Sequence, residues 1–162
     1  MLPKLVDALV MSHVCYCVQV KGSAGSVTVG KIKKIFNFAD RFLCNGGKFD
    51  YISDVLINLE WLTSTQFVNH ADLCMLHKLI VTGCPSVLSS RYTFNRDLVH
   101  QKTRQSGRLA LRKPRTNHGK RSFLHISSHM FNNMCAQMGD GDVGTVAFRS
   151  CKSLAKRVVR NV

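Results

Sequence analysis

A run of apolar residues at three- and four-residue steps constrains the fold of this chain most strongly. This spacing puts the residues on one face of an α-helix, whereas the lysines of the same segment lie mostly on the other face. The segment, Lys31 to Cys44, therefore predicts an amphipathic helix that ends near Asn45-Gly46-Gly47. The apolar positions are Ile32, Ile35, Phe36, Ala39, Phe42 and Leu43.

Helix signals also occur on both sides of this segment. Residues 2–20 are mostly apolar and predict a helix, and the Gly- and Ser-rich residues 22–26 predict a linker. Ser26 or Thr28 is the predicted cap of the following helix, because a hydroxyl there accepts a backbone N–H. Further along, Asp50 predicts the cap of a short helix.

Capping and breaking residues set the bounds of the next helix. Thr63-Ser64-Thr65-Gln66 carries a hydroxyl and an amide three residues apart, which predicts a capping box. Gly83 and Pro85 predict the end of this helix, because glycine adopts left-handed backbone angles and proline cannot continue a helix. The chain is therefore expected to be mainly helical up to about residue 90.

The residues beyond 90 show a different pattern. No apolar period is sustained there, so we expect loops with short strands at 109–111 and 123–126. A last helix is predicted from about Val143 to Val159. The expected fold is mainly α: a helical lobe over residues 1–90, then a basic, irregular lobe over 91–162 with short strands and a C-terminal helix.

Charge separates the two halves of the chain. The 162 residues include 23 Lys and Arg against 9 Asp and Glu, a net charge of +14. Residues 1–90 carry eight basic and six acidic side chains, whereas residues 91–162 carry fifteen basic and three acidic ones. A net of +12 in the second half implies an anionic partner. Nucleic acid is the first candidate, an acidic membrane surface is the second, and a merely solubilising basic tail is the third.

The densest basic stretch is the predicted site of contact with RNA or DNA. Lys and Arg neutralise backbone phosphates and release counterions, which makes binding tight and sensitive to salt. The predicted contact residues are Arg104, Arg108, Arg112, Lys113, Arg115, His118, Lys120 and Arg121, with Lys152 and Lys156 of the last helix.

Aromatic residues lie among these charges. Tyr92, Phe94, His118 and Phe123 are predicted to stack on unpaired bases. The alternative is that Phe123 and Leu111 anchor the core and that the charges are only solvated.

A metal site is a weaker hypothesis. His70, Cys74 and His77 share one helix face and offer three zinc ligands. Cys74 belongs to a strongly apolar stretch, however, which favours ordinary packing. Asp140 and Asp142, the only close pair of acids, lie on a Gly-rich turn, so we expect neither a Mg²⁺ site nor phosphoryl transfer by this chain alone.

Cysteine usage and the lack of targeting signals indicate a compartment. Seven cysteines at irregular spacing favour free thiols in a reducing environment. The N-terminus lacks the order of a secretory signal, and no apolar run reaches membrane-spanning length. We expect an intracellular protein of the nucleus and/or cytoplasm with no membrane partner.

An ordered set of short motifs runs along the chain. The most specific stretch is Pro114 to Phe123, "PRTNHGKRSF". The others are Val10 to Cys17, Gly22-Ser23-Ala24, Lys31 to Arg41, Asp72 to Leu79, Thr103 to Ser106 and Phe131-Asn132. In this order, from about residue 5 to 160, the chain resembles the C-terminal portion of reverse transcriptases from non-LTR retrotransposons of the jockey- and CR1-like kind.

The resemblance implies a thumb and post-thumb region. The resemblance matches Asn37, Ala39 and Arg41 to a thumb helix. The similarity of Phe38-Ala39-Asp40-Arg41 to the catalytic aromatic-Ala-Asp-Asp element of such polymerases is therefore interpreted as a coincidence. The palm, whose paired aspartates bind the catalytic Mg²⁺, would lie in upstream reverse transcriptase domains. The implied function is to grip template–primer or element RNA, without a cofactor of its own and with the thumb helices along the duplex minor groove.

Two alternatives stay open. One is a standalone, non-enzymatic basic interaction protein, or a decayed element copy with no retained activity. The other is a small zinc protein, which would unfold when a chelator removes the metal.

Overall fold

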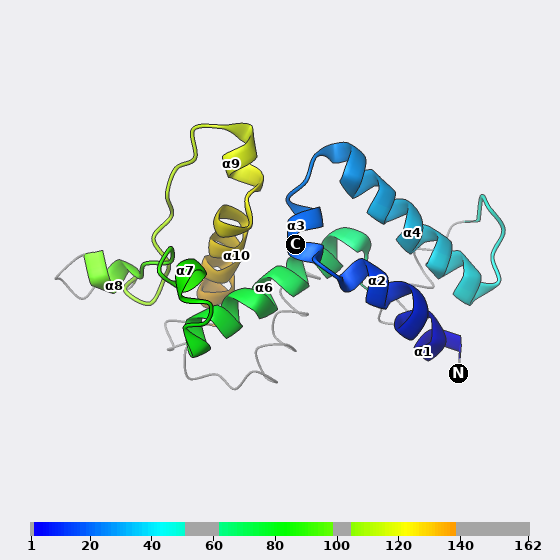
Figure 1. The fold of residues 1–162 in the computed structure, drawn as a ribbon, viewed down its shortest axis with the longest axis horizontal. Helices are drawn as coiled ribbons and strands as arrows, with labels where there is room; N and C mark the ends of the chain where they lie inside the picture. Colours follow the sequence, from blue (N-terminus) through cyan, green and yellow to red (C-terminus); the bar gives the residue numbers. More distant parts are fainter. Residues whose placement is uncertain (1, 51–61, 99–104, 139–162) are drawn as a thin grey trace. The chain divides into compact units, whose positions relative to one another are not determined.

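The fold is mainly α-helical, as predicted from the sequence. The computed structural model describes residues 2–50, 62–98 and 105–138 (Figure 1). The chain forms two compact units, Met1–Val68 and Asn69–Val162. Within the described ranges, the only β-type pairing is an isolated antiparallel bridge between Phe94 and Leu109. No helix of the described part is long and apolar enough to cross a membrane.

The N-terminal residues of the first unit form a broken helix. Residues 2–20 were expected to form one helix, but α1 (Leu2–Val6) passes into a π-helical turn, η1 (Asp7–Met11), and then into α2 (Ser12–Cys15). Cys17 has a left-handed φ of 53°, which separates α2 from α3 (Val18–Gly22). The prediction of a continuous helix is therefore wrong.

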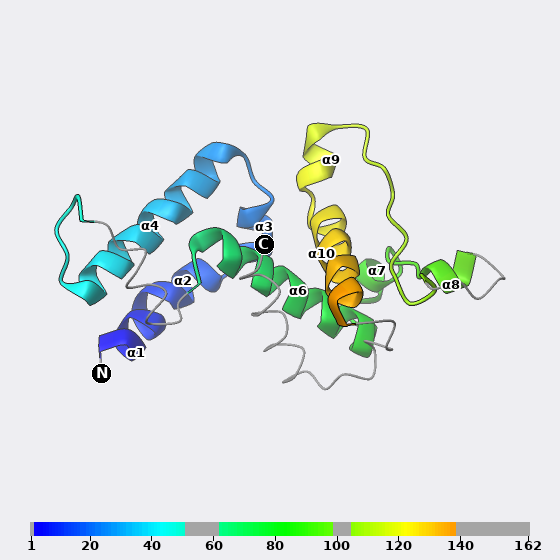
Figure 2. The ribbon, with the colours of Figure 1, turned by 180° about the vertical axis from the view of Figure 1, so that it is seen from behind.

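The amphipathic segment forms α4 (Ser26–Cys44), the long helix of the first unit (Figure 2). Its N-cap is Gly25, which has no side chain to accept a backbone N–H, so the predicted cap by Ser26 or Thr28 is wrong. Its predicted end is confirmed: Asn45 has a left-handed φ of 52°, and the Gly46 N–H donates to the Arg41 carbonyl at 2.9 Å.

One face of α4 packs into the core of the first unit. Ile32 and Phe36 are buried against the N-terminal helices, and the Phe36 ring centroid lies 5.3 Å from that of Phe67. Ala39 is also buried. The other predicted inward positions, Ile35, Phe42 and Leu43, are not buried, so the apolar face of α4 is wider than the core that covers it.

Helix α6 (Ser64–Thr82) takes part in both units, because the division falls between Val68 and Asn69. Its predicted capping box is confirmed: the Thr63 N–H donates to Gln66 Oε1 at 3.1 Å, and the Gln66 N–H donates to Thr63 Oγ1 at 3.4 Å. Its predicted end is confirmed as well, since Gly83 follows with a φ of 66°.

The core of the second unit joins α6 to the last described helix, α10 (Phe123–Met138). The lobe boundary predicted at 90/91 lies inside this unit. Short helices α7 (Ser86–Ser89), α8 (Asn95–Leu98) and α9 (Asn117–Arg121) lie between α6 and α10. The buried cluster consists of Leu73, Leu76, Leu109, Phe131, Met134 and Cys135.

The two predicted strands of the second half do not form. Residues 123–126 begin α10. The helical spacing of apolar residues becomes visible only when Phe131, Met134 and Cys135 are included, so four residues alone did not reveal it. Of residues 109–111, only Leu109 makes a bridge. The predicted helix after Asp50 and the predicted last helix lie outside the described residues.

Among the described residues, one carboxyl group is buried in each unit. Asp40 is 3% exposed and Asp72 is 4% exposed. Burial raises the pKa of Asp40 to about 6, partly opposed by the Arg41 guanidinium, and raises the pKa of Asp72 to about 7. Between the ordinary pKa of 3.8 and these raised values, the folded protein therefore keeps protons on these groups that the unfolded chain has released.

We predict that Asp72→Asn stabilises the protein at pH 8. The folded pKa of Asp72 lies above its unfolded value of 3.8, so its ionisation destabilises the fold increasingly from pH 4 to pH 7. Removing this ionisation should raise the free energy of unfolding on the order of 3 kcal/mol at pH 8. It should change little at pH 4. Urea unfolding at both pH values, followed by circular dichroism, measures this.

The exposed Asp97→Asn is the matched control and should leave the pH dependence unchanged. A variant D72N that is less stable than the wild type at pH 8 would show that the ionised carboxylate supports the fold.

Candidate nucleic-acid interface

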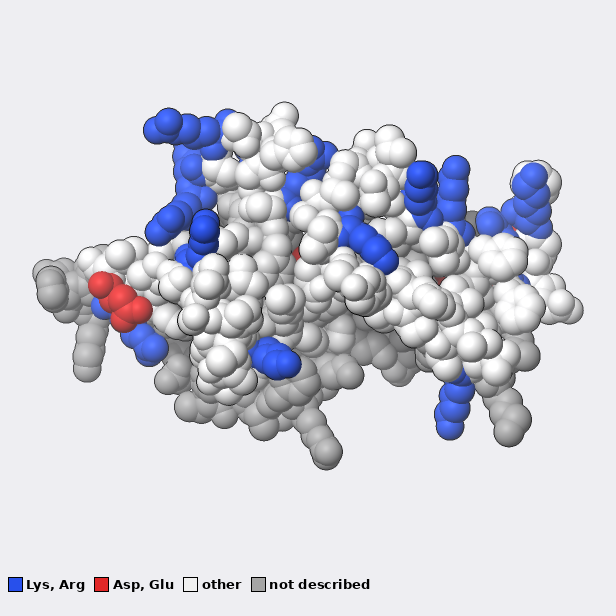
Figure 3. All heavy atoms as spheres, in the orientation of Figure 1, with Lys and Arg blue, Asp and Glu red and all other residues white. Residues whose placement is uncertain are grey.

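The candidate site is the connection between α8 and α10, described from Gln105 to Arg121 and called the basic segment below. It contains six Lys and Arg residues and no Asp or Glu. In Figure 1 it is the long loop that rises to α9. Figure 3 shows Lys and Arg side chains gathered over this loop and α9, at the upper left.

The basic segment is fixed to α10 by one side-chain amide. The Leu109 N–H donates to Asn132 Oδ1 at 2.8 Å, and Asn132 Nδ2 donates to the Leu109 carbonyl at 2.9 Å. The Leu109 side chain is 1% exposed and belongs to the core of the second unit. Both polar backbone groups of a buried residue are therefore satisfied by a single asparagine.

Backbone hydrogen bonds hold the other side of the same stretch. The Ala110 N–H donates to the Thr93 carbonyl at 2.8 Å, and the Asn95 N–H donates to the Arg108 carbonyl at 2.9 Å. The basic segment therefore lies between Thr93–Asn95 on one side and α10 on the other, which fixes the point from which its exposed part emerges.

The far end of the basic segment is ordered by two helix caps. Thr116 Oγ1 accepts the Gly119 N–H at 3.1 Å and caps α9. Ser122 Oγ donates to the Gly119 carbonyl at 2.7 Å and accepts the His125 N–H at 3.4 Å. Glycine is required at 119, because a Cβ there would lie 2.8 Å from the Cβ of Pro114.

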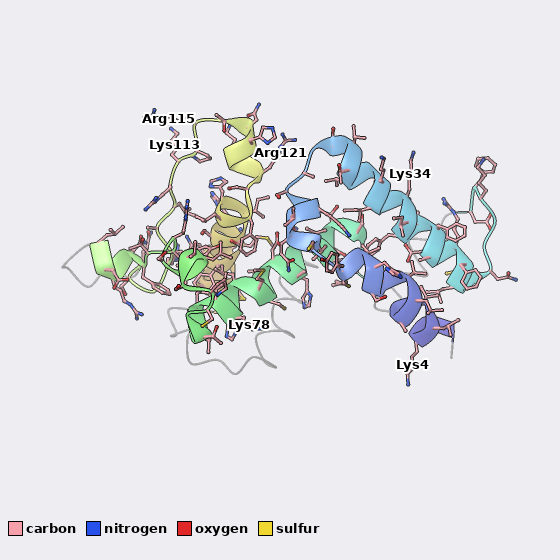
Figure 4. The ribbon with its side chains drawn as sticks, viewed as in Figure 1. Lys4, Lys34, Lys78, Lys113, Arg115 and Arg121 are labelled. Atoms are coloured by element: carbon pink, nitrogen blue, oxygen red, sulfur yellow. The ribbon has the colours of Figure 1, made fainter. Side chains whose placement is uncertain are left out.

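The cations between these anchors are exposed. Arg112, Lys113 and Arg115 are exposed on the loop, and Figure 4 shows Lys113 and Arg115 extending away from it. His118 and Lys120 are exposed on α9. The structure thus brings five of the predicted contact residues onto one short segment.

Two other predicted contact residues are partly buried. Arg108 and Arg121 are half-buried, and the Nε atom of each is buried with no hydrogen-bond partner among the described residues. The one salt bridge within the described ranges joins Arg96 and Asp97 at 3.9 Å, so no described carboxylate pairs with the basic segment. Predicted residues Arg104, Lys152 and Lys156 lie outside the described residues.

The aromatic residues mostly serve the fold. The Tyr92 hydroxyl lies 2.9 Å from Ser127 Oγ, and the Phe94 ring packs edge-on against Phe131 with 6.5 Å between centroids. Both rings are partly buried against the core, and their role in base stacking stays a prediction. His118 is exposed and Phe123 is half-buried.

Sequence reasoning missed the residues that anchor the site. Leu111 was weighed as a core anchor, but it is 43% exposed and Leu109 fills the core instead. Asn132 was noted only within the Phe131-Asn132 motif. No local signal singles it out, because α10 also carries Ser, His and Gln side chains and a second asparagine, Asn133.

Three residues of α6, His70, Cys74 and His77, were also weighed as metal ligands. Cys74 Sγ lies 3.7 Å from His70 Nε2, and His77 is buried. His125 and His129 contact each other with ring centroids 4.7 Å apart. Among the described residues, no three His, Cys, Asp or Glu side chains are grouped closely enough to hold a metal ion.

Comparison of the chain with protein-family models, with curated proteins and with solved structures finds no match.

We predict that Asn132→Ala destabilises the second unit by about 2–4 kcal/mol, because it leaves the buried N–H and carbonyl of Leu109 unsatisfied. Urea unfolding measured by circular dichroism tests this. The neighbouring Asn133 is exposed, so Asn133→Ala is the matched control and should change the free energy of unfolding by less than about 0.5 kcal/mol. Equal effects of the two variants would mean that the amide clamp is energetically unimportant.

Proposed function

We propose that this chain binds nucleic acid through the basic segment, as the C-terminal, thumb and post-thumb part of a reverse transcriptase of the non-LTR retrotransposon kind. The observation that carries the proposal is the exposure of Arg112, Lys113, Arg115 and Lys120 on one acid-free segment. The sequence resemblance supports it, since the same segment contains most of its most specific stretch, Pro114 to Phe123.

The mechanism is electrostatic. Exposed guanidinium and ammonium groups pair with backbone phosphates, and the release of condensed counterions provides most of the free energy. The anchors at Leu109 and Ser122 fix the two ends of the exposed cations, so less loop freedom is lost on binding. Contacts of this kind position a polynucleotide and carry no base specificity.

The role within a larger enzyme follows from what these residues offer. They grip the phosphates of a template–primer duplex or of element RNA. The chemistry, paired aspartates with Mg²⁺, would come from upstream reverse transcriptase domains. Such a role takes place wherever the element RNA is found, in the nucleus and/or cytoplasm.

We predict that the triple variant Arg112→Glu, Lys113→Glu, Arg115→Glu loses at least about a hundredfold in affinity for an RNA–DNA hybrid at low salt, because attraction to phosphates becomes repulsion. Fluorescence anisotropy with a labelled hybrid measures this. The matched control replaces Lys4, Lys48 and Lys78, three exposed lysines outside the basic segment, by Glu. It makes the same change in net charge, and Figure 4 shows Lys4 and Lys78 on α1 and α6.

The proposal requires a larger loss in the first variant than in the control. Equal losses would mean that only net charge matters. Unchanged binding by the first variant, or no binding by a folded wild-type chain, would contradict the proposal and favour the alternative of a protein-interaction module.

A further inference from the structure

The outward face of α4 has no cover among the described residues. Ile35, Phe38 and Phe42 lie on it at steps of three and four residues, so their side chains form one continuous stripe. They are 42%, 72% and 54% exposed. Large apolar side chains that are exposed together, rather than singly, indicate an interaction surface.

Cations border this stripe. Lys31 and Lys34 are exposed and precede Ile35 and Phe38 by four residues each, which puts them beside the stripe on the same side of α4. Figure 4 shows Lys34 extending outward from the helix. The one acid of α4, Asp40, is buried on the opposite face and does not offset this charge at the surface.

We infer that the outward face of α4 is a docking site for an acidic amphipathic helix of a partner protein. The stripe is about 10 Å long, which is two turns of α-helix and matches apolar anchors at i, i+3 and i+7 of a partner helix. Asp or Glu residues beside those anchors would pair with Lys31 and Lys34.

Charge and composition argue against other occupants. Two copies of the α4 face packed symmetrically would bring the same lysines together, and α4 has no exposed acid to pair with them. The phosphate backbone of a nucleic acid would satisfy the lysines, but its polar surface would leave Ile35 and most of the stripe in contact with water. An acidic helix satisfies both the apolar side chains and the cations.

The test uses a labelled synthetic helix of 21 residues with Leu at i, i+3, i+4 and i+7 positions and Glu beside them. Fluorescence anisotropy should show saturable binding to the full chain. It should show at least about tenfold weaker binding to Phe38→Ser/Phe42→Ser and to Lys31→Glu/Lys34→Glu. The matched control, Val81→Ser/Val87→Ser, removes two apolar side chains that are 54% and 71% exposed and should bind normally.

Four results would overturn the inference. The first is no binding of the Glu-bearing helix, or equal binding of a version with Lys in place of Glu. The second is a dimer of the wild-type chain in analytical ultracentrifugation that Phe38→Ser/Phe42→Ser dissociates. The third is sedimentation with phosphatidylserine vesicles that depends on the two phenylalanines. The fourth is binding of the RNA–DNA hybrid that Phe38→Ser/Phe42→Ser abolishes. Loss of hybrid binding in the triple Glu variant of the basic segment alone would bear on the proposed function and not on this inference.

Discussion

The amide of Asn132 holding the backbone of Leu109 is the interaction on which the second unit depends. It joins α10 to a segment that otherwise consists of loop and one short helix, and it does so at a residue that is 1% exposed. A loop with so many like charges repels itself, so it needs fixed points to stay near the core. The buried Leu109 side chain and the satisfied Leu109 backbone provide one such point, and the caps at Thr116 and Ser122 provide the next.

The distribution of charge follows from the same packing. Four cations of the basic segment are exposed to water, whereas Asp40 and Asp72, which carry negative charge when ionised, are buried. Burial raises the pKa of Asp40 to about 6 and that of Asp72 to about 7, so each carboxyl group is mostly neutral only below its own raised pKa. Ionisation of these buried groups therefore lowers the stability of the fold as the pH rises toward neutral.

Local patterns predicted helices well where a chemical signal marked their ends. The capping box at Thr63, the end at Gly83 and the left-handed cap at Asn45 each depend on a few neighbouring residues, so the sequence contains the whole signal. The burial of individual residues of α4 was less predictable. An apolar stripe in the sequence does not determine which of its residues the neighbouring helices cover, and Phe36 is buried whereas Phe42 is exposed. The anchor at Asn132 depends on a contact 23 residues away, which no local pattern contains.

The salt dependence of nucleic-acid binding tests the central claim most directly. Anisotropy of a labelled RNA–DNA hybrid would be measured with the wild-type chain over a series of salt concentrations. Four exposed cations of the basic segment, Arg112, Lys113, Arg115 and Lys120, should make the slope of log K against log salt about −3 or steeper. A slope near zero, or no binding by a chain that circular dichroism shows to be helical, would contradict the account.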